Sequence, residues 1–193
     1  LNSTILKITD AFENYQLDKL SLLIDDMYLE LSRVYIQMTR ERVENKIVIA
    51  TIYKVLLECL KLMSPVMPFI SEAIYQDLKK EFKLKEESIH MFKWPNADKK
   101  SINLKLEEEM KIVQMIIADV LADRAKSQIG VRWPLRKVVV YGKDLSKYSE
   151  IIKRQTNVKE IVFKKGAFRV ELDKVYDSEL EREGFARELV RNI

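Results

Sequence analysis

The stretch DKLSLLIDDMYLELSRVYIQM, residues 18–38, decides the fold class. Its apolar residues recur at steps of three and four, the spacing of one face of an α-helix. The apolar positions are Leu20, Leu23, Ile24, Met27, Leu31, Tyr35 and Met38. We therefore expect one long amphipathic helix here, with that face turned toward a core.

Similar periodicity extends on both sides of this helix. We expect further helices over residues 5–15, 46–63, 69–82 and 104–126. Asn2 or Ser3 is the expected cap of the first helix, because short polar side chains accept hydrogen bonds from its free N–H groups. Pro65 and Pro68 separate the helices over 46–63 and 69–82. The polar segment 84–103 predicts a long loop.

The period changes after residue 126. Short β-rich runs occupy residues 137–141, 159–163 and 167–172, and a short helix capped by Asp144 is expected over 144–155. A last helix begins near Ser178 and reaches the chain end. We predict a mainly α fold, with a bundle of about five helices over residues 1–126. A small basic α/β module follows over 127–193, truncated at its C-terminal helix.

Composition excludes several classes of protein. Of the 193 residues, 47% are hydrophobic and only four are glycine, which argues against disorder and against a glycine-rich phosphate loop. The single cysteine, Cys59, cannot form an internal disulfide, so we expect a reducing, cytoplasmic compartment. No apolar run is long enough for a membrane span. The chain begins with Leu1 rather than methionine, and we expect it to be part of a longer protein.

Charge is unevenly distributed along the chain. Residues 1–123 carry 17 Lys+Arg against 20 Asp+Glu, whereas residues 124–174 carry 14 against 5. Residues 175–193 carry 3 against 5. The basic segment favours a polyanionic partner, since phosphate contacts release counterions. A lysine-rich solvated surface is the alternative.

Catalytic signatures are missing. His90 and Cys59 could form a nucleophilic pair, but Cys59 lies within a helical pattern where a buried thiol is the simpler interpretation. Glu107, Glu108 and Glu109 are consecutive, so they point in different directions around a helix and suit its N-terminal dipole better than one metal ion. We expect no catalytic site, metal or cofactor within this chain.

Two basic clusters remain as binding candidates. The first basic cluster is Arg33, Arg40, Arg42 and Lys46, at the end of the long helix. Arginines beside Tyr35 on a rigid helix could hold phosphates and stack on exposed bases. Alternatively, these cations only stabilise the negative end of the helix dipole, or pair with nearby carboxylates.

The second basic cluster lies between the two predicted domains. It comprises Arg124, Lys126, Arg132, Arg136 and Lys137, with Trp133 among them. Trp133 precedes Pro134 and could either pack a domain boundary or stack on a base; packing is the favoured alternative.

Several strings resemble class I aminoacyl-tRNA synthetases. LSRVYIQMTRERV (31–43), LLECLKLMSPVMPFISEAIYQDL (56–78) and SIHMFKWP (88–95) are similar to elements of the anticodon-binding bundle shared by the isoleucyl, valyl and leucyl enzymes. DRAKSQIGVRWPLRKVVV (123–140) and SELEREGFARELVRNI (178–193) resemble segments of isoleucyl-tRNA synthetases in particular. The order of these strings matches, and the archaeal and eukaryotic form of that family fits best.

This resemblance implies a C-terminal fragment of such a synthetase, with the anticodon-binding bundle followed by a junction module. The family's His-x-Gly-His and Lys-Met-Ser-Lys-Ser motifs do not occur in the chain. The parent would be an isoleucine–tRNA ligase that uses ATP and Mg at a catalytic domain outside these residues.

The resemblance also implies partners and site residues. We expect the fragment to bind tRNA(Ile) and to work with the parent's own catalytic domain, as a monomer without membrane contact. The expected tRNA-binding residues are Arg33, Arg40, Arg42, Lys46, Arg124, Lys126, Arg132, Trp133 and Arg136. The alternatives are the same region of a valyl or leucyl enzyme, or a helical protein-interaction module in a synthetase assembly.

Overall fold

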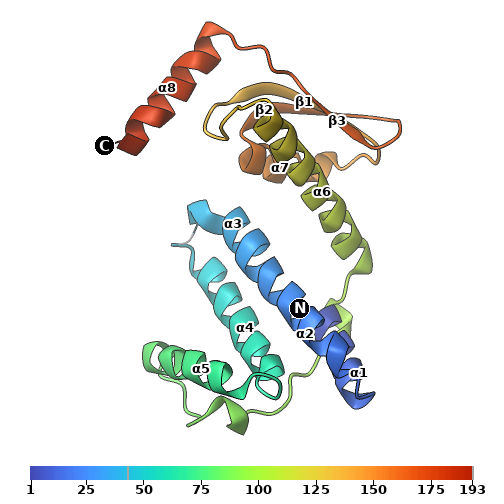
Figure 1. Ribbon diagram of the computed structural model, residues 1–193, viewed down its shortest axis with the longest axis vertical. Coiled ribbons are helices and arrows are strands. Elements are labelled where there is room, and N and C mark those ends of the chain that lie inside the picture. Colours follow the sequence, from blue (N-terminus) through green and yellow to red (C-terminus); the bar gives the residue numbers. More distant parts are fainter. Residues whose placement is uncertain (43, 193) are drawn as a thin grey trace. The chain divides into compact units, whose positions relative to one another are not determined.

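The computed structural model describes residues 1–42 and 44–192 (Figure 1). Val43, the last residue of the quoted string 31–43, and Ile193 lie outside the described residues. The chain divides into two compact units, Leu1–Ile102 and Asn103–Ile193. Each unit has its own apolar core, and we call them unit 1 and unit 2.

Unit 1 is helical. It contains α1 (Asn2–Glu13), α2 (Leu17–Leu29), the π-helical η1 (Glu30–Tyr35), α3 (Ile36–Thr39), the 3₁₀ turn η2 (Arg40–Arg42), α4 (Lys46–Met63) and α5 (Pro68–Phe82). One core cluster joins α1, α2 and α4, and includes Ile8, Leu20, Ile24 and Leu62. A second joins α4 to α5 through Leu60 and Tyr75.

The long helix predicted from residues 18–38 is present as α2, η1 and α3. Helical dihedrals at Glu30 and Ile36 show that these three elements follow one another without a break. Leu20, Ile24, Met27 and Leu31 are buried as predicted, but at the far end Thr39 is buried in place of Met38. A π-helical turn holds more residues than an α-helical turn, so η1 shifts the inward face toward later positions.

The start of α1 differs from the prediction. Asn2 is already helical and does not cap α1; its side chain accepts a hydrogen bond from the backbone N–H of Asp98, at 3.2 Å. Tyr15, the last residue of the range expected for this helix, instead follows α1 with a positive φ and is 87% exposed. The first helix therefore ends earlier than its apolar spacing suggested.

The loop after α5 is held to the helices by specific contacts. It contains the 3₁₀ turns η3 (Ile89–Met91) and η4 (Lys99–Ser101). The Glu72 carboxylate accepts hydrogen bonds from Ser88 Oγ (2.8 Å) and from the backbone N–H of Ile89 (3.0 Å). The Trp94 indole donates to Thr9 Oγ1 at 2.9 Å. Several motif residues that carried the resemblance thus have a structural role in unit 1.

Unit 2 is an α/β unit. It contains α6 (Leu104–Lys126), β1 (Leu135–Tyr141), the 3₁₀ turn η5 (Ser146–Tyr148), α7 (Ser149–Thr156), β2 (Val158–Lys164), β3 (Arg169–Leu172) and α8 (Ser178–Asn192). Its three strands are ordered β2-β1-β3, with β1 parallel to β2 and antiparallel to β3. The helix α7 connects the two parallel strands. Residues 144–155 were expected to form this helix, which begins only at Ser149. The Asp144 carboxylate accepts a hydrogen bond from the backbone N–H of Ser146, at the start of η5 (2.9 Å).

The boundary between the units differs from the predicted domain boundary after residue 126. It lies between Ile102 and Asn103, because α6 belongs to unit 2. Val113, Ile116 and Val120 of α6 are buried in one cluster with Leu135 and Val138 of β1. Figure 1 shows α6 and α7 beside the sheet that they cover. The periodicity of α6 gave its helical state but not the surface against which it packs.

The fold class is mainly α, as predicted from the sequence. Helices α1 to α5 form unit 1, and the small sheet belongs to unit 2. None of the helices in residues 1–42 and 44–192 is long and apolar enough to cross a membrane.

Candidate nucleic-acid interface

The first basic cluster lies where the chain turns from α3 into α4. Arg40 and Arg42 belong to η2, and Lys46 is the first residue of α4. Arg33, within η1, and these three residues are all exposed. None of the four forms an ion pair with any side chain that the structure describes. All four cations thus lie at the surface of the described part of the chain.

The helix dipole explains only part of this cluster. Arg40 and Arg42 follow the C-terminus of α3, where positive charge is favourable. Lys46, by contrast, occupies the first turn of α4, whose free N–H groups already carry positive partial charge. Asn45 caps this turn by accepting a hydrogen bond from the N–H of Ile47 at 2.9 Å. A purely structural role for the first basic cluster thus does not explain Lys46. The N-terminus of α4, where Lys46 lies, favours a bound anion.

The exposed Ile47 is a feature of this surface that the sequence pattern does not indicate. Its side chain is 75% exposed beside Lys46. The apolar spacing of residues 46–63 predicts Ile49 on the inner face of the helix, but Val48 is buried and Ile49 is exposed. The inner face of α4 is therefore offset by one residue at its start, and Ile47 adds an apolar contact next to the cations.

Arg124 of the second basic cluster is buried, which contradicts its expected role in direct phosphate binding. It is 1% exposed, and its Nη2 donates hydrogen bonds to the backbone carbonyls of Gly130 (2.6 Å) and Trp133. Burial lowers the pKa of this guanidinium, although arginine stays protonated. Arg124 therefore holds the segment after α6 against that helix. Its buried guanidinium cannot itself contact RNA in this conformation.

The other cations of the second basic cluster remain at the surface. Arg132 pairs with Glu188 at 3.7 Å, Arg136 with Asp177, and Lys137 with Glu160 at 3.2 Å. Lys126 is exposed without an ion pair to a described side chain. Exposed ion pairs contribute about 0–1 kcal/mol, so a phosphate group can replace these carboxylates at little cost.

Trp133 packs inside unit 2. Its ring meets Phe185 and Tyr176 edge-on, with centroids 5.1 and 6.0 Å apart. A Cβ added at Gly184 of α8 would overlap the indole ring, so α8 approaches it closely. Trp133 thus has the packing contacts of the first alternative, while its side chain remains partly exposed.

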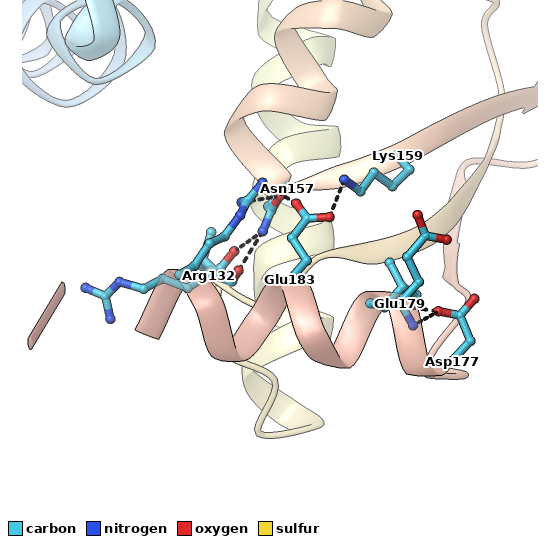
Figure 2. Close-up of polar contacts among 9 residues, drawn as sticks. Arg132, Asn157, Lys159, Asp177, Glu179 and Glu183 are labelled. Carbon is cyan, nitrogen blue, oxygen red and sulfur yellow. Dashed lines mark hydrogen bonds and ion pairs between the residues drawn. The ribbon is translucent and has the colours of Figure 1, made fainter. Parts of the chain in front are cut away.

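A polar network holds the loop that carries Arg132. The Asn157 amide donates to the carbonyls of Val131 (2.9 Å) and Arg132 (3.0 Å), and its oxygen accepts from Arg187 at 2.8 Å. Figure 2 shows Asn157 beside Glu183, which also binds Lys159 at 2.6 Å. The hydrogen bond from Lys159 is the main cause that lowers the pKa of Glu183.

Asn157 was not singled out from the sequence. It follows α7 in a left-handed conformation, with φ of 50°. Asparagine between a helix and a strand is a recognisable helix-ending signal. Its contact to residues 131 and 132 depends on tertiary structure.

The basic excess of residues 124–174 is partly balanced by acidic residues from α6, from α8 and from the residue just before α8. Lys143 and Lys147 both pair with Glu109, whose pKa is lowered to about 2, chiefly by the hydrogen bond from Lys147. The acidic partners that lie outside that segment are Glu109, Asp123, Asp177, Glu183 and Glu188. By unit, residues 1–102 carry 15 Lys+Arg and 15 Asp+Glu, whereas residues 103–193 carry 19 and 15. The net positive charge thus belongs to unit 2, but it is smaller than the segment alone suggested.

Nucleophilic chemistry is not supported at Cys59. The thiol is buried between α4 and its neighbours, and burial raises its pKa to about 11. A thiol with this pKa is protonated at neutral pH and is a poor nucleophile. Among the residues that the structure describes, no three His, Cys, Asp or Glu side chains are placed to hold a metal ion.

Comparisons with known proteins show which family the chain resembles. A family model described as the anticodon-binding domain of tRNA ligase matches residues 1–140. The isoleucine–tRNA ligase of Thermococcus kodakarensis is 34% identical over 176 residues, which is 84% of this chain and 16% of that protein. That of Pyrococcus horikoshii is 31% identical over 179 residues, 86% of this chain and 17% of that protein.

A bacterial relative is equally similar. The isoleucine–tRNA ligase of Clostridium tetani is 36% identical over 172 residues, covering 84% of this chain and 17% of that protein. The chain thus spans about a sixth of the length of these relatives. Because the family model covers most of the chain, including all of the first basic cluster, the chain belongs to the family of anticodon-binding domains of tRNA ligases.

Proposed function

We propose that this chain is the tRNA-recognition part of an isoleucine–tRNA ligase. It binds the anticodon arm of tRNA(Ile) and positions that tRNA for ATP-dependent aminoacylation at a catalytic domain outside these residues. The relatives named isoleucine–tRNA ligase support the choice of amino acid. The ATP and Mg requirement, the cytoplasmic location and the monomeric state of the whole protein are parts of the same proposal.

The single observation that carries the proposal is the exposed first basic cluster within a matched anticodon-binding family. An anticodon arm offers stem phosphates and unstacked loop bases, which proteins read by ionic contacts and by stacking. Arg33, Arg40, Arg42 and Lys46 hold phosphates in this proposal. A rigid helical turn fixes the positions of these cations, which lowers the entropic cost of binding.

Unit 2 supplies a separate set of contacts. Lys126, Arg132 and Arg136 are the candidates there, since their side chains are exposed. Arg124 and Trp133 act indirectly, because they hold the segment that carries Arg132 and Arg136. Of the nine tRNA-binding residues expected from the sequence, seven thus contact the tRNA in this proposal and two hold the segment that carries the others in place.

A salt titration of tRNA binding tests the first basic cluster. We expect Arg40→Ala and Arg42→Ala each to weaken binding of this chain to an isoleucine tRNA transcript and to lower the salt slope by about one. Lys19→Ala, which removes an exposed cation from α2 of the same unit, is the matched control and should leave both unchanged.

Other outcomes would favour the alternatives. Equal affinity of wild type and both arginine variants for the tRNA would contradict the assignment of the first basic cluster as a tRNA-binding site. It would favour a protein contact instead, since Val66, Met67, Phe69 and Ile70 form an exposed apolar group at the start of α5. Aminoacylation by the whole protein distinguishes an isoleucyl enzyme from a valyl or leucyl one.

A further inference from the structure

The connection from β2 to β3, which passes the end of β1, has a basic and aromatic tip that none of the expected contacts includes. We define the crossover tip as Lys164–Arg169 together with Tyr141 and Gly142, which end and follow β1. The backbone N–H of Gly142 donates to the carbonyl of Lys164 at 2.9 Å, so the two parts are joined directly.

The Tyr141 ring orders this tip. A Cβ added at Gly166 would lie 3.3 Å from Tyr141 Cδ1, so the backbone of the tip rests against the ring. The Arg169 guanidinium lies 4.0 Å from the ring centroid, and Lys164 Nζ lies 5.8 Å from it. The tyrosine hydroxyl also donates to Glu171 at 3.2 Å. The tip is therefore preorganised, which reduces the entropic cost of binding a ligand.

Phe168 presents an aromatic surface at this tip. Its side chain is 43% exposed, and its Cδ2 lies 3.7 Å from the position a Cβ would take on Gly142. The ring thus rests on the glycine while a large part of it faces solvent. Since a half-exposed phenylalanine contributes less to the core than a buried one, a binding role gives a reason for its position.

The charges around Phe168 are suited to phosphate. Lys164 and Lys165 are exposed and form no ion pair with a side chain that the structure describes. Arg169 pairs with Glu171 at 3.1 Å, and both side chains are about half exposed. Lysine is depleted at protein–protein interfaces, whereas lysines beside exposed rings are typical of single-stranded nucleic-acid sites.

We propose that the crossover tip binds unpaired RNA, with a base stacked on Phe168 and neighbouring phosphates held by Lys164 and Lys165. This inference rests on the proposed function and deepens it, because it assigns unit 2 to the unstacked nucleotides of the tRNA. Stacking needs a free base face, which a duplex does not offer. Arg169 exchanges Glu171 for a phosphate on binding.

Substitutions of Phe168 test the stacking contact. The probes are a short single-stranded RNA and a blunt duplex that contains the same sequence. We expect Phe168→Leu to weaken binding of the single strand by roughly 5- to 100-fold and to leave duplex binding unchanged. Phe168→Tyr keeps the ring and should bind the single strand like wild type.

Substitutions of the lysines test the phosphate contacts. The double variant Lys164→Ala with Lys165→Ala should lower the salt slope for the single strand by about 1.4, since each phosphate contact contributes roughly 0.7. The matched control, Lys105→Ala with Lys111→Ala, removes two exposed lysines of α6 in the same unit and should leave the slope unchanged.

The outcomes separate this inference from the proposed function. Equal binding of the single strand by the leucine and tyrosine variants, or equal salt slopes for the two double variants, would overturn the proposed RNA binding by the crossover tip. If Arg40→Ala weakens tRNA binding while the tip variants bind RNA like wild type, the proposal for the tip is wrong and the proposed function is retained. If the tip variants weaken single-strand binding while the chain shows no affinity for tRNA, the proposal for the tip is retained and the proposed function is wrong.

Discussion

At the residue scale, Arg124 and Arg132 belong to the same basic segment but have opposite surroundings. Arg124 is enclosed by α6 and the segment that follows, where its Nη2 satisfies two backbone carbonyls. Arg132 is exposed, and its Nη1 lies 3.7 Å from Oε1 of Glu188. Both are arginines in a charged stretch, so residue type and spacing could not separate them. The difference arises because the chain after α6 folds back over Arg124.

Replacing Arg124 should destabilise unit 2. We expect Arg124→Met, which keeps most of the side-chain volume, to lower the free energy of unfolding by about 1.5–3 kcal/mol, because hydrogen bonds from a charged group are lost. Urea unfolding of the chain measures this effect. Lys126→Ala, an exposed neighbour, should change stability by less than about 0.5 kcal/mol. Equal unfolding midpoints for the two variants would contradict the assigned role of Arg124.

At the element scale, the sequence predicted most helices and strands but not their partners. The helices α4 and α6 have the predicted bounds because three- and four-residue apolar spacing is a local property of the chain. The π-helical η1 was not predicted, and it moves the buried position from Met38 to Thr39. The approach of α8 to Trp133 was not predicted either, because it depends on residues distant in sequence.

Gly184 gives a test of how α8 packs. Glycine to alanine within a helix normally stabilises a protein by roughly 1 kcal/mol. Here the added Cβ would overlap the Trp133 ring, so we expect Gly184→Ala to lower the unfolding midpoint in urea. Gly130→Ala is the matched control, since its Cβ would lie 3.7 Å from the same ring, an ordinary contact. A midpoint for Gly184→Ala at or above wild type would show that α8 does not pack on Trp133 in this way.

At the scale of the whole molecule, the two units differ in their charge. Unit 1 has balanced formal charge and carries the first basic cluster, whereas unit 2 carries the net positive charge. Most of the site residues predicted from the sequence are at the surface, because charged residues are costly to bury without partners. Arg124 and Trp133 are the exceptions, and each is explained by contacts within unit 2.

The boundary between the units can be tested with separate polypeptides. We expect residues 103–193 to fold alone, because they contain the whole cluster around Val113, Ile116 and Val120. Residues 127–193 should not fold, because the sheet would lose the apolar face of α6. Circular dichroism with thermal unfolding measures both. A cooperative transition for residues 127–193 would restore the boundary predicted from the sequence.

The sequence by itself determined the helical class, the positions of most elements, the absence of catalytic motifs and the resemblance to anticodon-binding regions. These properties follow from local periodicity and from residue strings that need no knowledge of distant contacts. Tertiary structure alone decided that α6 belongs with the sheet, that Arg124 is buried, and that carboxylates of α6 and α8 balance the basic segment. The physical reason is that burial and charge pairing depend on which distant segments meet, whereas helical periodicity does not.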